Sequence, residues 1–287
     1  AGICCHKNAF CRVSLYNVFD VCAFFHIVSV LLFCDIPFFK GHCQMDVLLT
    51  NDDGINADGL RHLYAALIAR GHHVNVVAPV RQQSGVGHSL TVFEPLRSKK
   101  IVDGDFEGNG IYGTPTDCVK LGLGCLSPRR PDLVMSGINL GPNAGPDLFY
   151  SGTVGAAAEA AHDNVPSMAI SWGGFSPSPL LGKIAEHAVG LAEKIDWQAL
   201  APRRVINVNY PNLKVEDMKG LRVCPQSLAV WRNIYEERKD PRGSSYWWLD
   251  GDVPKDSILE GTDKDLLARG YITVTPLRFE YTDEAGI

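Results

Sequence analysis

Short apolar runs alternate with segments of helical period between residue 46 and about residue 212. Each run is bounded by turn residues, which is typical of a strand buried on both faces. The predicted strands lie at residues 46–50, 73–78, 131–136, 166–171 and 204–209, and the predicted helices at 60–68, 118–123, 154–161 and 180–195. Residues 90–111 interrupt the alternation with an irregular, β-rich excursion. The pattern predicts an α/β fold with a mostly parallel, doubly wound sheet.

The chain changes character after about residue 212. The predicted elements there are strands at 220–225 and 271–276, a hairpin-like stretch with exposed aromatics at 240–249 and a short helix at 263–269. Trp231, Tyr246 and Trp247 could stack on a base, but aromatics in an arm more often pack between subunits. We therefore expect an α/β core over residues 45–212 and a C-terminal extension over residues 213–287 that serves as an oligomerisation arm.

The first 44 residues differ in kind from the rest. Residues 21–39 are rich in Phe, Val, Leu and Cys, but His26, Asp35 and Pro37 interrupt them, so the apolar part is short for a membrane span. Three interpretations compete: a membrane anchor, a targeting peptide, or sequence upstream of the true start. We favour the third, because Met45 stands immediately before the first predicted strand.

Composition and charge narrow the classes of function. The chain has 287 residues, 46% of them apolar, with a formal net charge of −5. This balance supports a globular core and argues against a nucleic-acid groove, which needs a basic face, although small anionic substrates stay compatible. Only three of the nine cysteines follow Met45, which favours a reduced, cytoplasmic setting. Because no CxxC pair occurs, a cysteine-built zinc site is disfavoured.

Asp52 and Asp53 directly follow the first predicted strand. The carboxyl ends of parallel strands open to solvent at the edge where α/β proteins bind ligands. Adjacent carboxylates repel each other and raise each other's pKa unless a cation lies between them. A hard divalent metal with oxygen ligands, Mg²⁺ or Mn²⁺, is the simplest occupant.

Three more polar groups are predicted at the same edge of the sheet. Ser84 follows the second strand, Asn139 follows the third, and the turn Ser151-Gly-Thr153 opens an alanine-rich helix. Carboxylate, hydroxyl and amide oxygens are ligands that a hard cation prefers. A helix N-terminus with two hydroxyls is suited to hold phosphate. A metal beside a phosphate cradle indicates phosphoryl transfer to water.

Each of these groups also has a simpler interpretation. An acidic pair after a strand is often a loop and a helix cap, and Ser151 could be an ordinary N-cap. Ser84 alone is more often a turn residue, and Asn139 between glycines is more often a turn former. A lone histidine such as His88 or His162 could be a general acid but is more often structural. The hypothesis depends on the convergence of all the elements at one edge.

Familiar competing motifs are missing from the sequence. It contains no G-x-x-x-x-G-K-[ST], no G-x-G-x-x-G after the first strand and no G-x-S-x-G. These absences disfavour a P-loop, a dinucleotide-binding fold of the usual type and an α/β-hydrolase. An aspartyl-phosphate phosphatase stays a rival, but its two acids are usually separated by one residue, whereas Asp52 and Asp53 are adjacent.

Several linked motifs resemble those of the SurE family of survival proteins, which are bacterial and archaeal 5'/3'-nucleotidases. The motifs are Asn51-Asp-Asp-Gly54, Pro79-x-x-x-x-Ser-Gly85, Gly113-Thr-Pro-Thr-Asp117, Ser136-Gly-Ile-Asn-x-Gly141, Tyr150-Ser-Gly-Thr153, Asp240-Pro-Arg-Gly243, Gly261-Thr-Asp263 and Gly270-Tyr-Ile-Thr-Val-Thr-Pro276. They run in order from Met45 to about Pro276. The leader before Met45 has no counterpart in the family, and family members usually continue past the position of Ile287 into a terminal helix. If that end is a truncation, the swapped arm is incomplete.

The resemblance implies a Rossmann-like three-layer α/β/α core with a C-terminal β-rich arm that swaps between subunits, in a homodimer or homotetramer. It implies metal-dependent release of phosphate from nucleoside 5'- and 3'-monophosphates, and in some members from short polyphosphate, with one divalent ion per subunit. The family's metal ligands correspond to Asp52, Asp53, Ser84 and Asn139. Its phosphate-binding residues correspond to Asn139 and to the turn Ser151, Gly152 and Thr153.

Our hypothesis assigns catalysis to Asp52, Asp53 and Asn139. Asp52 orients or deprotonates the attacking water, and direct attack by its carboxylate is left open. The alternative from another class is a non-catalytic, metal-dependent nucleotide- or anion-binding module on the same fold. A third hypothesis is a phosphatase tethered to a membrane through residues 21–39.

Overall fold

The computed structural model describes residues 44–200, 202–280 and 282. The strands are β1 (Asp46–Thr50), β2 (His73–Pro79), β3 (Arg97–Asp103), β4 (Phe106–Tyr112), β5 (Leu133–Leu140), β6 (Ser167–Trp172), β7 (Arg204–Tyr210), β8 (Leu221–Val223), β9 (Arg232–Lys239), β10 (Ser245–Asp252) and β11 (Ile272–Arg278). The α-helices are α2 (Asp58–Ala69), α3 (Pro115–Leu121), α4 (Gly152–His162), α5 (Leu180–Ala192) and α6 (Asp263–Ala268). A π-helical turn follows α3, and the 3-10 helix η2 (Gly145–Tyr150) precedes α4.

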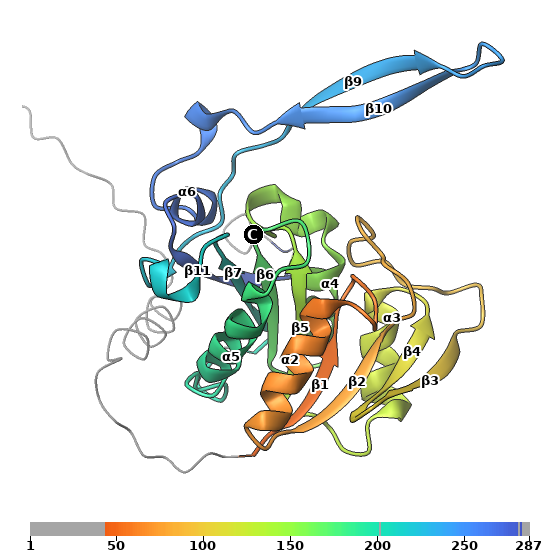
Figure 1. The fold of residues 1–287 in the computed structure, drawn as a ribbon, viewed down its shortest axis with the longest axis vertical. Coiled ribbons are helices and arrows are strands. Elements are labelled where there is room, and N and C mark those ends of the chain that lie inside the picture. Colours follow the sequence, from red (N-terminus) through yellow and green to blue (C-terminus); the bar gives the residue numbers. More distant parts are fainter. Residues whose placement is uncertain (1–43, 201, 281, 283–287) are drawn as a thin grey trace, which may run out of the picture.

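Nine strands form one sheet in the order β3-β4-β2-β1-β5-β6-β7-β11-β8. The six strands from β4 to β7 in this order run parallel. At the two ends of this parallel set, β3 pairs antiparallel with β4 and β11 pairs antiparallel with β7. From β1 the chain goes by way of α2 to β2 on one side, and later reaches β5 on the other side (Figure 1). The edge between β1 and β5 is therefore a topological switch point, where open α/β sheets bind ligands.

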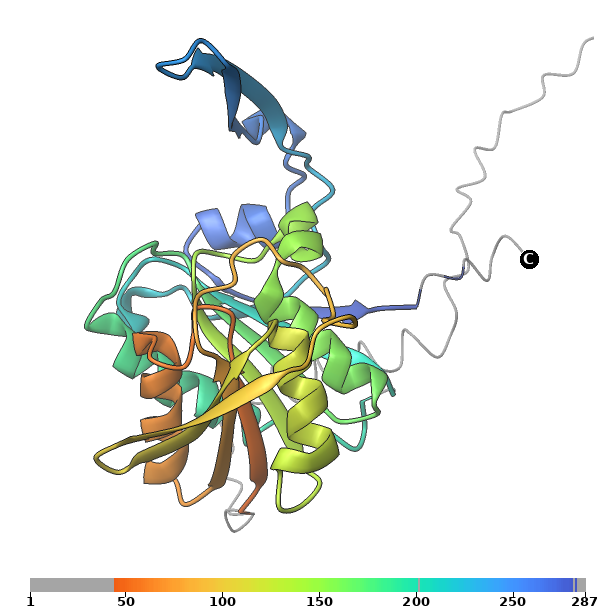
Figure 2. The same ribbon diagram turned by 90° about the vertical axis from the view of Figure 1, so that its right-hand side faces the viewer.

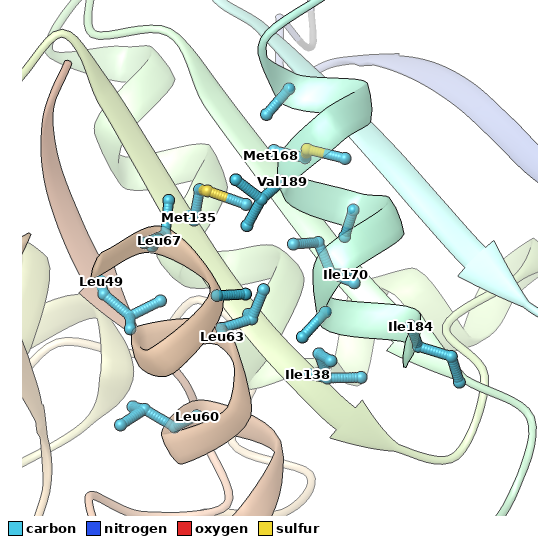
Figure 3. Close-up of a cluster of buried hydrophobic side chains, with 14 of the residues drawn as sticks. Leu49, Leu60, Leu63, Leu67, Met135, Ile138, Met168, Ile170, Ile184 and Val189 are labelled. Carbon is cyan, nitrogen blue, oxygen red and sulfur yellow. The ribbon is translucent and has the colours of Figure 1, made fainter. Parts of the chain in front are cut away.

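Helices cover both faces of the sheet and confirm the predicted three-layer α/β arrangement (Figures 1 and 2). Leu49 of β1 packs with Leu60 and Leu63 of α2 on the face that α5 also covers (Figure 3). The neighbouring Leu48 lies in the opposite cluster with Ala156 of α4, because successive strand residues point to opposite faces. Burial of both faces explains why the strands read as continuous apolar runs.

The first strand was predicted to the residue, and the excursion at 90–111 is the antiparallel pair β3–β4. The predicted end of the third strand at residue 136 is wrong, because β5 continues to Leu140. The register with β6 shifts between Ser136 and Asn139. Gly137 has a φ of +138°, and a Cβ there would lie 2.3 Å from the carbonyl oxygen of Ile170. Glycine is required at this position because the strand forms a bulge here and then continues. Asn139 therefore lies on β5 rather than in a turn.

The β9–β10 hairpin projects away from the sheet (Figures 1 and 2). The hairpin-like stretch predicted at 240–249 is confirmed, but its first strand begins earlier, at Arg232, and its second ends later, at Asp252. Asp240 closes the turn by accepting hydrogen bonds from the backbone N–H groups of Arg242 and Ser244. Strands β8 and β11, which also follow residue 212, complete the main sheet.

The predictions for the first 44 residues fall almost entirely outside the described part of the chain, including the apolar stretch at 21–39. Within the described residues 44–200, 202–280 and 282, we find no helix long and apolar enough to cross a membrane.

Candidate active site

Asn51 builds the turn that follows β1. Its Oδ1 accepts a hydrogen bond from the backbone N–H of Gly54 at 3.2 Å, and its Nδ2 donates to the Gly54 carbonyl oxygen at 3.0 Å. Gly54 has a φ of +102°, and a Cβ there would come within 3.4 Å of the Arg81 backbone. The buried Asn51 thus holds a turn whose two intervening residues are the acidic pair.

Asp52 is almost fully buried, with 6% of its surface exposed. The hydroxyl of Thr153, at the start of α4, donates a hydrogen bond to its Oδ1. Burial raises the pKa of Asp52 to about 6, and the neighbouring charge of Asp53 adds to the rise, although the Thr153 hydrogen bond opposes it. Asp52 is therefore a desolvated carboxylate whose charge is only partly compensated.

Asp53 joins β1 to the end of β5. Its Oδ2 accepts a hydrogen bond from the backbone N–H of Leu140 at 3.2 Å, and its Oδ1 accepts one from Gln82 Nε2 at 3.3 Å. Burial also raises the pKa of Asp53. Because Leu140 directly follows Asn139, the carboxylate lies beside the end of β5, as the predicted convergence requires.

Ser84 lies on the exposed loop after β2 and is linked to the acidic pair through Gln82. Gln82 Nε2 donates to Ser84 Oγ at 3.0 Å as well as to Asp53. The backbone N–H of Gln83 donates to the Asp52 carbonyl oxygen at 2.7 Å and draws this loop towards the turn after β1. Gln82 was not predicted, because nothing local distinguishes it from Gln83.

Asn139 is partly buried at the end of β5. Its Nδ2 donates to the Gly141 carbonyl oxygen at 2.7 Å, and no hydrogen bond within the described chain engages its Oδ1. An amide held in this orientation presents an oxygen, which is the donor that a hard cation prefers.

The turn Ser151-Gly-Thr153 brings the N-terminus of α4 onto Asp52. A Cβ at Gly152 would lie 2.8 Å from Asp52 Cβ, so only glycine allows this approach. Ser151 Oγ accepts a hydrogen bond from the backbone N–H of Val154 at 3.1 Å, and Ser151 is therefore an N-cap, as its simpler interpretation stated. The positive end of the helix dipole faces the acidic pair.

The oxygen atoms gathered here fit a hard divalent cation. Among the described residues (44–200, 202–280 and 282), neither Asp52 nor Asp53 takes part in an ion pair, and no three His, Cys, Asp or Glu side chains form a metal-binding group. The candidate set has two carboxylates and is completed by a hydroxyl and an amide oxygen. Adjacent carboxylates without a counter-charge, one buried and one half-buried, are stabilised by such a cation.

Neither candidate histidine forms a hydrogen bond or ion pair with the acidic pair within the described residues. His88 Nε2 is 2.7 Å from Glu159 Oε2, and Lys120 Nζ donates to Glu159 Oε1 at 2.6 Å. His162 ends α4, at the opposite terminus from Thr153. The contacts of His88 support the structural interpretation.

Three comparisons with known proteins find similarity to the same family. The family model described as survival protein SurE matches residues 47–233. A protein of Desulfovibrio desulfuricans named 5'-nucleotidase SurE is 62% identical over 247 residues, which cover 85% of this chain and 96% of that protein. A protein of the same name from Lawsonia intracellularis is 42% identical over 243 residues, 85% of this chain and 96% of the relative.

A solved structure extends the likeness to three dimensions. The crystal structure of SurE protein from Aquifex aeolicus superposes with a TM-score of 0.73 at 40% identity, covering 84% of this chain and 96% of the other. The linked motifs, the matching family model and relatives aligned over most of their length agree on one conclusion. This chain belongs to the SurE family of survival proteins.

Proposed function

We propose that this protein is a metal-dependent nucleotidase that releases phosphate from nucleoside monophosphates at the switch point between β1 and β5. The observation that carries the proposal is the contact between Asp52, the buried and only partly compensated member of the acidic pair, and the N-terminus of α4. Anionic phosphate is attracted to a helix N-terminus, whereas adjacent carboxylates repel it unless a cation lies between. The relatives named 5'-nucleotidase SurE support the same activity.

Asp52, Asp53, Ser84 and Asn139 are the residues that would hold one divalent ion per subunit, with Mg²⁺ or Mn²⁺ as the preferred candidates. When bound, such an ion neutralises phosphate charge and makes water more nucleophilic. Gln82 donates to Asp53 and Ser84 and thereby orients both oxygen groups.

Side chains and backbone N–H groups of the protein bind the phosphate and activate the water. Ser151, Gly152 and Thr153 face the phosphate with the backbone N–H groups at the start of α4, and Asn139 binds it from β5. Thr153 fixes Asp52 through its hydroxyl. Asp52 then orients the attacking water and accepts its proton at the carboxylate as the water oxygen bonds to phosphorus. The bond from phosphorus to the nucleoside oxygen breaks, and that oxygen takes up a proton so that the nucleoside leaves as its alcohol. Direct attack by Asp52 is the competing route, and a phosphoenzyme trapped on Asp52 would replace the water mechanism.

The proposed substrates are nucleoside 5'- and 3'-monophosphates and, further, short-chain polyphosphate. We propose a homodimer or homotetramer in the cytoplasm, with residues 213–287 as the region that carries the oligomerisation arm. Exposed aromatics on β9 and β10, namely Tyr235, Tyr246, Trp247 and Trp248, support an interface between copies, because large apolar side chains on an isolated hairpin gain stability when another surface covers them. Size-exclusion chromatography with light scattering tests this, and a monomer would exclude the interface.

A substrate panel separates the enzyme from the non-catalytic binding module. Phosphate release is measured from 5'-AMP, 5'-GMP, 3'-AMP and short polyphosphate, each with Mg²⁺, with Mn²⁺ and with chelator. The nucleotidase hypothesis predicts release that a chelator abolishes and added metal restores. Metal-dependent binding of AMP without release of phosphate would support the binding module instead. The relatives' names already count against that alternative.

A further inference from the structure

The loop of residues 141–150 lies between two parts of the candidate site. Asn139 lies two residues before it on β5, and the phosphate-binding turn begins at Ser151. Its second half is η2. The position of the turn therefore depends on what holds this loop.

The first half of the loop is fixed to the sheet. The backbone N–H of Asn143 donates to Asn209 Oδ1 at 2.8 Å, and its carbonyl oxygen accepts hydrogen bonds from Asn207 Nδ2 and Asn209 Nδ2, both at 2.9 Å. Asn143 Nδ2 also donates to Ser171 Oγ at 2.8 Å. These partners lie on β6 and β7 within the core.

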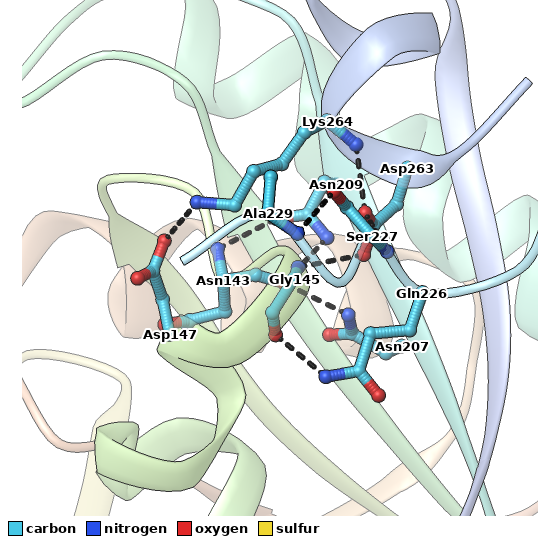
Figure 4. A network of polar contacts seen from close by, with 10 residues as sticks. All are labelled: Asn143, Gly145, Asp147, Asn207, Asn209, Gln226, Ser227, Ala229, Asp263 and Lys264. Atoms are coloured by element: carbon cyan, nitrogen blue, oxygen red, sulfur yellow. Dashed lines mark hydrogen bonds and ion pairs between the residues drawn. The ribbon is translucent and has the colours of Figure 1, made fainter. Parts of the chain in front are cut away.

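The second half is held by residues from the other end of the chain (Figure 4). The backbone N–H of Gly145 donates to Asp263 Oδ2 at 2.8 Å, and its carbonyl oxygen accepts a hydrogen bond from Gln226 Nε2 at 2.8 Å. Lys264 Nζ bonds to Asp147 Oδ2 at 2.7 Å. Gly145 has a φ of +58°, and a Cβ there would lie 2.5 Å from Lys264 Cε, so the fit is close.

Asp263 is the centre of this second anchor. It is fully buried, and its Oδ1 accepts hydrogen bonds from the backbone N–H groups of Ser227 at 2.8 Å and Lys264 at 2.7 Å. Burial raises its pKa, while the backbone donors oppose the rise. Ser227 precedes the β9–β10 hairpin and Lys264 follows it. One carboxylate thus ties both segments that bear the hairpin to the loop before Ser151.

We propose that Asp263 is a positioning residue for substrate binding: by holding Gly145 it fixes the loop that presents the phosphate-binding turn, and it connects this turn to the base of the β9–β10 hairpin. The role rests on the proposed function, because the turn is assigned there to phosphate. Asp263 touches neither Asp52 nor Asp53, whose positions are set by Leu140, Gln82 and Thr153. Asp263 therefore acts on phosphate binding more than on the metal ligands.

Asp263→Asn tests this role, because the amide keeps the size of the side chain but presents N–H groups to backbone donors. We expect the KM for AMP and the Kd for inorganic phosphate, measured with Mn²⁺ present, to rise about tenfold. The affinity for Mn²⁺ stays within about twofold, because the contacts of Asp52 and Asp53 with Thr153, Gln82 and Leu140 are intact. Thermal unfolding is followed on the same samples.

The matched control is Asp265→Asn on the same helix. Asp265 Oδ2 accepts a hydrogen bond from the backbone N–H of Gly261 at 2.9 Å and pairs with Arg269, away from the loop. We expect its KM and phosphate affinity to stay within about twofold of the unsubstituted protein. If both variants raise KM equally, α6 acts only through general stability and the proposal fails.

Further outcomes also test the positioning role of Asp263. Asp263→Asn with unchanged KM and phosphate affinity, or with a fall in kcat alone, overturns the proposal. If this variant does not fold, Gln226→Leu removes the other side-chain bond to Gly145 and should raise KM about threefold, whereas an unchanged KM is contrary to the proposal. If the unsubstituted protein releases no phosphate, the proposed function fails, while the comparison of phosphate binding still decides the role of Asp263.

Discussion

Two buried carboxylates lie along α4 and differ in their surroundings. Asp52 contacts the N-terminus of the helix and has the hydroxyl of Thr153 as its side-chain partner, whereas Glu159, two turns further along, contacts His88 and Lys120. The pKa of Asp52 is raised to about 6 by burial, while the hydrogen bond from His88 leads the effects that lower the pKa of Glu159 to about 2. A compensated carboxylate stabilises the fold, and an uncompensated one is available for chemistry.

The largest effect is expected from Asp52→Asn. Without this charge, phosphate release from AMP should fall at least about 1,000-fold, because both cation binding and water activation lose the same group. The fold should persist, since the amide keeps its size beside Thr153. Phosphate release measures the loss of activity, and circular dichroism measures the retention of the fold. Asp105→Asn, in the exposed β3–β4 turn, is the control and should retain full activity.

Gly152→Ala tests the close approach of α4 to Asp52. The added methyl group would lie 2.8 Å from Asp52 Cβ, so the helix start or the carboxylate must move. We expect kcat/KM to fall about 10- to 100-fold and the unfolding free energy to fall by about 1–3 kcal/mol. Gly124→Ala has no atom within 4 Å of the new methyl group and serves as the control. Unchanged kinetics in Gly152→Ala would show that this contact is unimportant.

Glu159→Gln should give the opposite outcome to Asp52→Asn: lower stability with kcat/KM changed by less than about threefold. Because the folded pKa of Glu159 lies below its ordinary value of 4.5, its stabilisation is present above that pH and is lost as pH falls towards 2. Its partners are more than a third exposed, so we expect a loss of only about 1–2 kcal/mol at neutral pH. Denaturant unfolding at several pH values should show the difference shrinking in acid.

The smallest effect concerns the stability of the metal-free protein. The folded pKa of Asp52 lies above its ordinary value of 3.8, so its ionisation destabilises the fold as pH rises from 4 to about 6. Metal-free Asp52→Asn should therefore be as stable as the unsubstituted protein at pH 8, or more stable by about 1 kcal/mol. A marked loss of stability would show that Asp52 is structural, as Glu159 is.

The sequence predicted the parts of the site that carry local signals. Asp52 and Asp53 follow an apolar run into a turn, and the order of strands and helices places that turn at the open edge of the sheet. Asn139 was assigned to the correct edge but to a turn, because the bulge at Gly137 depends on the distant carbonyl of Ile170.

Other contributions have no local signal. Gln82 and Gln83 are chemically identical neighbours, and only the folded loop directs one side chain to Asp53. Asp263 reads as the first residue of a short helix, yet its bond to Gly145 spans 118 positions in the sequence. Such contacts follow from tertiary packing, which periodicity and turn chemistry do not encode.

Calorimetric titration of Mn²⁺ into chelator-treated protein tests the central claim most directly. This claim is that the acidic pair after β1, which has no ion-pair partner among the described residues, holds the cation that phosphate release requires. The account predicts one ion per chain in the unsubstituted protein and in Glu159→Gln, and at least about 100-fold weaker binding in Asp52→Asn. Equal affinity in all three proteins would contradict it, because the cation would then be held elsewhere.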